Sequence, residues 1–294
     1  MRRRHWIFVC TTVTLLTAPV AEAWWEQQHR VVAAIAEQHL SDESRHAVGV
    51  LTEGRGLVDL ANWADQIKSK PAWRHTKPWH YIEIGDQQRL ETMVRDARGD
   101  ILRALNRSER HLRDASKDRR SRWQALAFTV HFIADLHQPL HVGNGTDRGG
   151  NQVSVIWLGD GDTPLKTNLH SVWDGLLTAQ KLPVEDYARA LNRATSEQIS
   201  AWQSTPTVEW ARESKALRAR AYAFGDNFIA GSLRNKLRSA GLVASEGPPI
   251  LGRDYADRTR PLAEQRLLMA GVRLAGQLNT IFALDRAEDA EPED

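Results

Sequence analysis

Apolar residues recur at helical spacing along most of the chain. The first clear case is the segment HRVVAAIAEQHL at 29–40, and the Ser41-Asp42 pair after it can end one helix and cap the next. Periodicity and length predict further helices at about 43–52, 58–69, 88–115, 121–137, 169–180, 185–203, 209–240 and 256–284. The pattern therefore predicts a mainly α, single-domain, multi-helix fold.

One segment, 142–165, clearly departs from this helical pattern, and two others have a distinctive composition. In 142–165 several glycines flank the short alternating run QVSVIWL, which predicts a loop carrying a small β-hairpin. The arginine-rich segment 102–122 has Glu109, Asp114 and Asp118 interspersed, so a solvated helix face is favoured over a binding patch. The end of the chain, AEDAEPED at 287–294, is expected to be an acidic disordered tail.

The N-terminus has the three parts of a cleavable export signal. Basic residues at 2–4 precede an apolar run at about 6–18, and Ala21-Glu22-Ala23 fits the A-x-A rule for signal peptidase. The apolar run is shorter than the roughly 20 residues that a membrane span needs, so we expect no membrane anchor. We therefore expect a signal peptide at 1–23, a mature domain at 24–286 that begins with Trp24, and a periplasmic or secreted protein.

Composition narrows the chemistry that the mature chain can carry. The single cysteine, Cys10, lies in the signal, so histidines and carboxylates must supply any metal ligands. The net charge of +2 comes from 39 basic and 37 acidic residues, and the signal holds three of the former and one of the latter. The mature chain is therefore formally neutral, and any attraction for phosphate must be local.

The strongest candidate for chemistry is HFIADLHQPLH at 131–141. His131 and Asp135 are four residues apart, so they point from one helical face toward a common metal. His141 follows Pro139, where the helix should have ended, and can turn toward a different ion. His137 lies about 240° around the helix from His131, so we leave it out of the site.

A second pair with the same spacing, His170 and Asp174, occurs in NLHSVWD. One such pair alone is more simply a histidine that pairs with a carboxylate or caps a helix, but two pairs favour a metal centre. Further candidates lie upstream: His29, Asp65 in NWADQIK, and His80 in KPWHYIEI. None of these three is persuasive by itself.

Taken in order, the motifs resemble those of the single-strand-specific zinc nucleases of the S1/P1 type, which are mostly helical phosphodiesterases. The resemblance covers Trp24 to about Asp174: an N-terminal Trp, a histidine five residues later, WAD, WHY, HFIxDxxQPLH, GGN and NLHSxWD. It implies three zinc ions in three ligand sets, namely Asp65, His80 and His131; Trp24, His29 and Asp135; and His141, His170 and Asp174. Asp135 would bridge the first two ions, and Trp24 would bind through its amino nitrogen and carbonyl oxygen.

The resemblance also implies residues that handle the substrate. Tyr81 would stack on a base, while Glu83 and Asn151 of GGN would read the base edge. Asp65 and Lys68 would be catalytic, with Asp65 orienting the attacking water and Lys68 lying near the scissile phosphate. Glu83 stands where fungal members have Asp, which leaves the base preference open.

The function implied is an endonuclease that hydrolyses single-stranded DNA and RNA to give 5′-phosphate ends, and the sequence leaves accompanying 3′-nucleotidase activity open. We expect a monomer whose partner is its nucleic-acid substrate. The main alternative is a zinc-dependent phospholipase C, whose last helical ligand is typically Glu where this chain has Asp174. A zinc-binding protein without turnover is a third reading, against which Lys68, Tyr81 and Asn151 argue.

Overall fold

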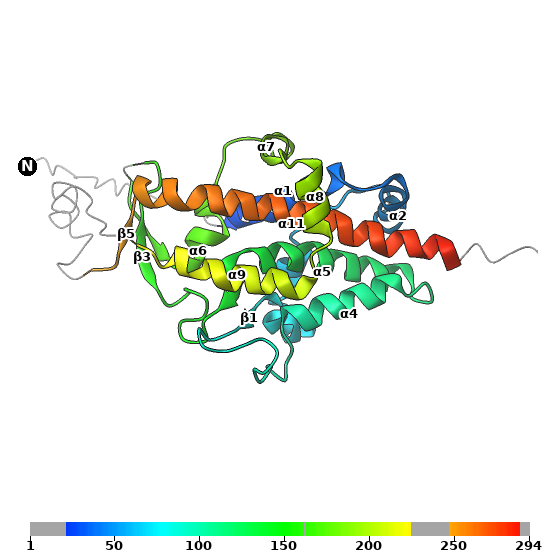
Figure 1. The fold of residues 1–294 in the computed structure, drawn as a ribbon, viewed down its shortest axis with the longest axis horizontal. Helices are drawn as coiled ribbons and strands as arrows, with labels where there is room; N and C mark the ends of the chain where they lie inside the picture. The colour runs from blue at the N-terminus through cyan, green and yellow to red at the C-terminus, as the bar shows by residue number, and fades with distance from the viewer. Residues whose placement is uncertain (1–21, 162, 225–246, 289–294) are drawn as a thin grey trace, which may run out of the picture.

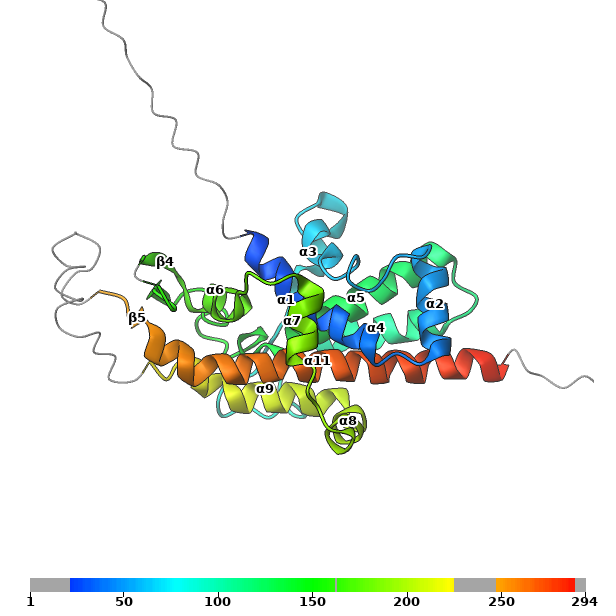
Figure 2. The ribbon, with the colours of Figure 1, turned by 90° about the horizontal axis from the view of Figure 1, so that it is seen from above.

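The computed structural model describes residues 22–161, 163–224 and 247–288, with side chains from residue 26 to residue 283. The fold is mainly α, as predicted. Figures 1 and 2 show the longest helix, α11 (Arg253–Glu288), running along most of the molecule with α1 (Glu22–Gln38), α5 (Arg119–His137) and α9 (Thr207–Ala221) beside it. None of the described helices has the length and apolar character needed to cross a membrane.

Helix α5 forms the centre of the core. It is buried at every position from Ala125 to Ile133, which is typical of a helix enclosed on all sides. It packs against α1, α9, α11, α2 (Asp42–Thr52), α3 (Trp63–Ile67) and α4 (Ile101–Arg113). Asp118 caps its N-terminus by accepting a hydrogen bond from the Ser121 amide, and the helix stops before Pro139. The two candidate ligands on α5 thus stand on a rigid element.

Helix α1 approaches α11 closely at Gly271. A Cβ atom added at Gly271 would lie 2.5 Å from Cγ2 of Ile35 and 2.9 Å from the carbonyl oxygen of Val32. Only glycine gives α1 this position without a shift of one of the two helices. The contact matters for the site, because α1 also carries His29.

Two small sheets complete the fold. Strands β1 (Ile82–Glu83) and β2 (Val142–Gly143) pair in parallel, with Ile82 opposite Val142. Strands β3 (Ser154–Trp157) and β4 (Leu165–Asn168) form the predicted hairpin, with Trp157 opposite Leu165. β3 also pairs in parallel with β5 (Ile250–Leu251), which the local pattern did not indicate because β5 is distant in sequence.

Several helix predictions were wrong in extent. The predicted helix 88–115 is helical only in α4, because Asp100 caps α4 and Gly99 before it has a φ of +106°. The predicted helix 185–203 is two helices, α7 (Val184–Leu191) and α8 (Ser196–Gln203), and Thr195 opens α8 with a capping box. The predicted helix 169–180 is α6 (Leu169–Asp174) followed by the short η3 (Leu176–Thr178).

Other segments also differ from the sequence predictions. Helix α3 is shorter than the predicted 58–69, and the 3₁₀ helix η1 (Pro71–His80) was not foreseen. A second 3₁₀ helix, η2 (Pro139–His141), follows α5. The predicted helix 209–240 is helical in α9 as far as Ala221, and its residues 225–240 lie outside the described residues. Residues 1–21 of the predicted signal and residues 289–294 of the predicted tail also lie outside them.

Gly271→Ala should destabilise the protein by about 1–3 kcal/mol, the usual cost of overpacking, because the new Cβ meets backbone and a branched side chain. Gly49→Ala in α2 is the matched control, since nothing lies within 4 Å of its added Cβ. That change should stabilise the helix by up to about 1 kcal/mol. Denaturant unfolding of both variants checks the pair, and equal stabilities would show that Gly271 does not limit the approach of α1 to α11.

Candidate metal centre

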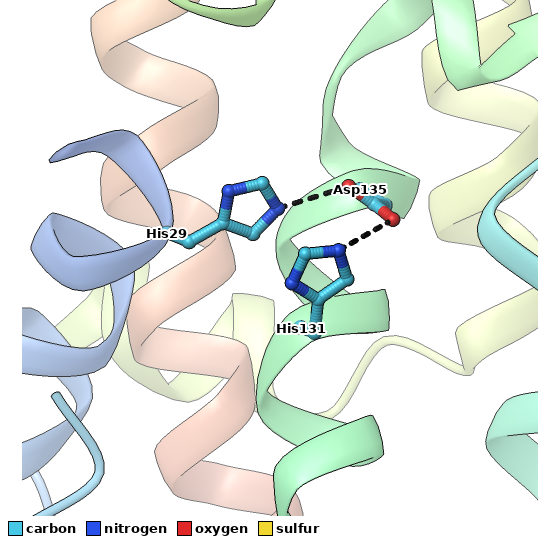
Figure 3. A group of neighbouring side chains, drawn as sticks. All are labelled: His29, His131 and Asp135. Atoms are coloured by element: carbon cyan, nitrogen blue, oxygen red, sulfur yellow. Dashed lines mark hydrogen bonds and ion pairs between the residues drawn. The ribbon is translucent and has the colours of Figure 1, made fainter. Parts of the chain in front are cut away.

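Asp135 lies at the middle of the candidate site. Its carboxylate is buried in the last turn of α5, and its two oxygens face different histidines. Oδ1 is 3.0 Å from Nε2 of His29, whereas Oδ2 is 3.0 Å from Nδ1 of His80 and 3.3 Å from Nε2 of His131. Figure 3 shows the rings of His29, on α1, and His131, on α5, both pointing toward Asp135. One carboxylate can therefore serve two neighbouring cations.

The first ligand set is brought together from three elements. Asp65 comes from α3, His80 from the end of η1, and His131 from α5. Oδ1 of Asp65 is 3.4 Å from Nδ1 of His80 and 3.3 Å from Nε2 of His131. Their potential ligand atoms lie within 4.8 Å of one another, so this set could hold one metal ion.

The third ligand set, made of His141, His170 and Asp174, is equally compact. Oδ1 of Asp174 is 3.1 Å from Nε2 of His141, and its Oδ2 is 3.1 Å from Nε2 of His170. His170 and Asp174 share one face of α6 as their spacing predicted, while His141 reaches them from η2. The same 4.8 Å limit holds for these ligand atoms, so this set too could hold an ion.

Backbone carbonyls fix the orientation of three of the histidines. The Nδ1 atoms of His131, His141 and His170 each lie 2.7 Å from a carbonyl oxygen, those of Ala61, His80 and Gly149 respectively. An Nδ1–H that donates to such a carbonyl leaves Nε2 turned toward the carboxylates, which is the usual support of metal-binding histidines. Gly149 is required at this point, because its φ is +59° and a Cβ there would lie 2.3 Å from the carbonyl oxygen of Leu140.

The electrostatics of the sets favour positive charge between the carboxylates. Burial alone would raise the pKa of Asp135 and Asp174, but neighbouring histidines hold both well below the usual range. Burial opposes the protonation of His131 and His141, yet the same carboxylates raise their pKa to about 10 and about 9. Protonated imidazoles thus supply a positive charge that bound cations would replace.

Buried nitrogen atoms provide a test of whether the site fits metal ions. Nε2 of His131 is buried and makes no well-aligned hydrogen bond, although it lies 3.3 Å from two carboxylate oxygens. Burial keeps His80 neutral by lowering its pKa to about 4, in spite of the nearby Asp135. Neutral imidazoles beside carboxylates are the donor set that divalent transition metals bind. The residues present therefore fit the metals that the sequence implies.

A cavity of about 380 Å³ opens over the ligand sets. The two residues predicted to be catalytic and the three predicted to bind the base all line it: Asp65, Lys68, Tyr81, Glu83 and Asn151. Tyr81 is 36% exposed, and Nζ of Lys68 lies 2.5 Å from Oδ1 of Asp65. Glu83 accepts a hydrogen bond of 2.7 Å from the Gly145 amide, and Nδ2 of Asn151 donates to the carbonyl oxygen of Arg148 at 3.0 Å. The wall of the cavity is thus polar and partly ordered.

Two basic residues of the cavity wall were missed by the sequence analysis. Lys77 and Arg148 line the same cavity as Lys68. Their positions beside the WHY and GGN motifs were the only available signal, since neither has a distinctive spacing. They add positive charge where a phosphate would enter.

The remaining predicted residues are Trp24 and the excluded His137. Trp24 lies in the first turn of α1, and its side chain is outside the described part of the chain. Nδ1 of His137 donates to the carbonyl oxygen of Ile133 at 2.7 Å, and its Nε2 accepts from Arg273 at 3.0 Å. His137 therefore belongs to none of the three sets.

Comparison with known proteins places the chain in a family. Residues 24–283 match the family model described as S1/P1 Nuclease. Endonuclease 4 of Arabidopsis thaliana is 31% identical over 281 residues, which cover 90% of each chain. Nuclease S1 of Aspergillus oryzae is 27% identical over 92% of this chain and 96% of its own, and nuclease P1 of Penicillium citrinum is 27% identical over 90% and 100%. On this match the chain belongs to the S1/P1 nuclease family.

Proposed function

We propose that the protein is a zinc-dependent endonuclease that hydrolyses phosphodiester bonds of single-stranded DNA and RNA and leaves 5′-phosphate ends. Membership of the S1/P1 nuclease family supports a nuclease, and the similar Arabidopsis protein is named an endonuclease. The observation that carries the proposal is that histidines and aspartates form three groups beneath one cavity lined by Lys68 and an exposed Tyr81. The groups are Asp65, His80 and His131; His29, His131 and Asp135; and His141, His170 and Asp174. A phospholipase C would not require this combination of residues.

Each ligand set would hold one zinc ion. Asp65, His80 and His131 would hold the first, His29 and Trp24 the second, and His141, His170 and Asp174 the third. Asp135 would be shared by the first two, because one of its oxygens faces His29 and the other faces His80 of the first set. Bound zinc ions lower the pKa of coordinated water toward about 7 and polarise phosphoryl oxygens.

The protein's own groups then direct the reaction. Asp65 is partly exposed at the cavity floor, where it orients the attacking water and accepts its proton. Lys68 stabilises the negative charge that develops on the phosphate. Its ammonium group stays protonated, because the neighbouring Asp65 raises the pKa of Lys68 in spite of burial. The bond between phosphorus and the 3′ oxygen then breaks, the 3′ oxygen takes up a proton from water, and the phosphate stays on the 5′ end of the departing strand.

Preference for single strands follows from Tyr81. A base stacks on an exposed ring only when its face is free, and a base inside a duplex has no free face. Glu83 and Asn151 lie in the same cavity and would contact the edge of the stacked base. The base-binding residues would thus hold one unpaired nucleotide of the substrate.

We further propose that the active protein is an exported monomer that begins at Trp24. The family match begins at this residue, and the preceding Ala-Glu-Ala fits signal peptidase. His29 and Asp135 supply only part of the second ligand set, so the free amine of Trp24 would complete it. Such a protein acts in the periplasm or outside the cell.

The direct test is product analysis with purified protein that begins at Trp24. We expect about three zinc ions per chain and cleavage of single-stranded DNA and RNA to 5′-phosphate ends, with little cleavage of duplex DNA or phosphatidylcholine.

Asp65→Asn should lower turnover about 10²–10⁴-fold, since an amide cannot accept the proton. This variant should retain more metal than Asp135→Asn. One zinc or fewer in active protein, or near-wild-type turnover of Asp65→Asn, would contradict the assignment.

Tyr81→Ala should weaken the binding of single-stranded oligonucleotides by about 1–3 kcal/mol, because it removes the stacking surface. Tyr81→Phe keeps the ring and serves as the control, with binding close to wild type. Metal content should be unchanged in both variants. The comparison uses Michaelis constants on single-stranded and duplex substrates, and an alanine variant with unaltered strand preference would rule out the stacking role.

Protein that retains Ala23 should bind less zinc and cleave more slowly than protein that begins at Trp24. An amide nitrogen has its lone pair delocalised into the carbonyl group, so it cannot replace a free amine as a ligand. The free amine has a pKa of about 7.7–8.0 and loses its proton readily to a metal ion. Zinc content and cleavage rate are measured on both forms, and equal values would remove Trp24 from the ligand set.

A further inference from the structure

A hollow of about 330 Å³ on the surface of α4, separate from the catalytic cavity, is lined by four arginines. Arg103, Arg107 and Arg110 follow one another at spacings of four and three residues, so they share one face of the helix. All three are exposed, and Arg95 reaches the hollow from the segment before α4. The arrangement concentrates positive charge on one side of the molecule.

The acidic residues of the segment 102–122 do not neutralise the arginine face of α4. Glu109 pairs with Arg113 and accepts a hydrogen bond from Gln277. Asp114 accepts hydrogen bonds from Ser116, and Asp118 caps α5. The sequence indicated a balanced, solvated face because these carboxylates are interspersed with the arginines, but the fold uses all three elsewhere.

Within the hollow, positive charges also outnumber negative charges. The carboxylate of Asp100 pairs with Arg95, at 2.7 Å from Nε, and lies 3.9 Å from Nε of Arg103. Among the residues that the structure describes, no carboxylate lies within ion-pair distance of Arg107 or Arg110. Like charges at these helical spacings repel each other, so the surplus is available to an anionic partner.

Two contacts connect α4 and its arginine face to residues at or beside the wall of the catalytic cavity. The Ile101 amide at the start of α4 donates to the carbonyl oxygen of Tyr81 at 3.1 Å. The guanidinium carbon of Arg107 lies 5.1 Å from the ring centre of Trp79, which directly precedes His80 of the first ligand set. A rise of about 1.5 Å per residue places Arg110 about 13 Å along the helix from Ile101. The arginines therefore lead away from the residue proposed to hold the unpaired base.

We propose that Arg103, Arg107 and Arg110 bind phosphates of a single-stranded polynucleotide whose scissile bond lies in the catalytic cavity. A cavity of about 380 Å³ has the size of a small-molecule site, so a polymer must extend beyond it. Guanidinium groups match phosphate oxygens in geometry and charge. The inference rests on the proposed function, and it adds a binding surface for long substrates outside the reacting centre.

The test compares a triple variant, Arg103→Gln with Arg107→Gln and Arg110→Gln, on substrates of two lengths. For a single-stranded oligonucleotide of about 30 residues, kcat/KM should fall about tenfold or more at low salt, while a dinucleotide is cleaved within about twofold of the wild-type rate. The dependence of log kcat/KM on log salt should flatten by about 2, at roughly 0.7 for each lost phosphate contact.

The matched control removes the same charge from exposed positions in loops outside α4: Arg55→Gln, Lys181→Gln and Arg193→Gln. It should stay within about twofold of wild type on both substrates. Arg110→Glu is a second probe, because this side chain touches neither Trp79 nor a described carboxylate and its replacement should not disturb folding. We expect it alone to lower kcat/KM on the long substrate about threefold or more.

Two failures can be told apart. If wild type cleaves both substrates and the α4 variants behave like the control, the arginine surface is not a binding site, while the proposed function stands. If wild type cleaves neither substrate, the proposed function fails. In that case, fluorescence anisotropy with the labelled long oligonucleotide tests the arginine surface without cleavage. Equal binding by wild type and variants would overturn the proposed binding surface.

Discussion

Three aspartate carboxylates held close together, one of them buried and two half-buried, are the constraint on which the rest of the site depends. Carboxylates removed from water repel one another and require nearby positive charge. Here histidine Nε2 or Nδ1 atoms lie 3.0–3.4 Å from the carboxylate oxygens of Asp65, Asp135 and Asp174, and the protonated His131 and His141 supply opposing charge. A cluster of this kind is stable only while it holds protons or cations, which makes it suited to several metal ions.

The fold holds this cluster in place with buried arginines that lie outside it. Arg218 of α9 donates to the carbonyl oxygens of Ile84, Val142 and Gly143 at 2.6–3.0 Å, and so fixes β1 against β2 beside Glu83 and His141. Arg266 of α11 donates to the carbonyl oxygen of His137 at the end of α5 and pairs with Glu213. Each of these charges is paired or fully hydrogen-bonded, so burial gives rigidity at the edge of the site.

What could be predicted from the sequence was mostly local. The i, i+4 pairs His131 with Asp135 and His170 with Asp174 are set by helical geometry alone, and the structure has both on one face of a helix. Asp65 and His80 could be joined to them only through the family resemblance, because their approach depends on how α3 and η1 pack on α5. Gly271 and Arg218 act across long sequence separations, and no local pattern marks them.

The distribution of surface charge could be predicted least well from the sequence, again because it depends on contacts that only the fold creates. A charge count treats every carboxylate as free to neutralise a neighbour, yet Asp118 is used as a helix cap and Glu109 is turned toward Arg113 and α11. Screening limits each surface charge to about 8 Å at physiological salt, so only the local balance acts on a bound polymer. A chain whose formal net charge is only +2 can therefore present a positive helix face on α4, because carboxylates that the count treats as free, such as those of Glu109 and Asp118, are used in other contacts.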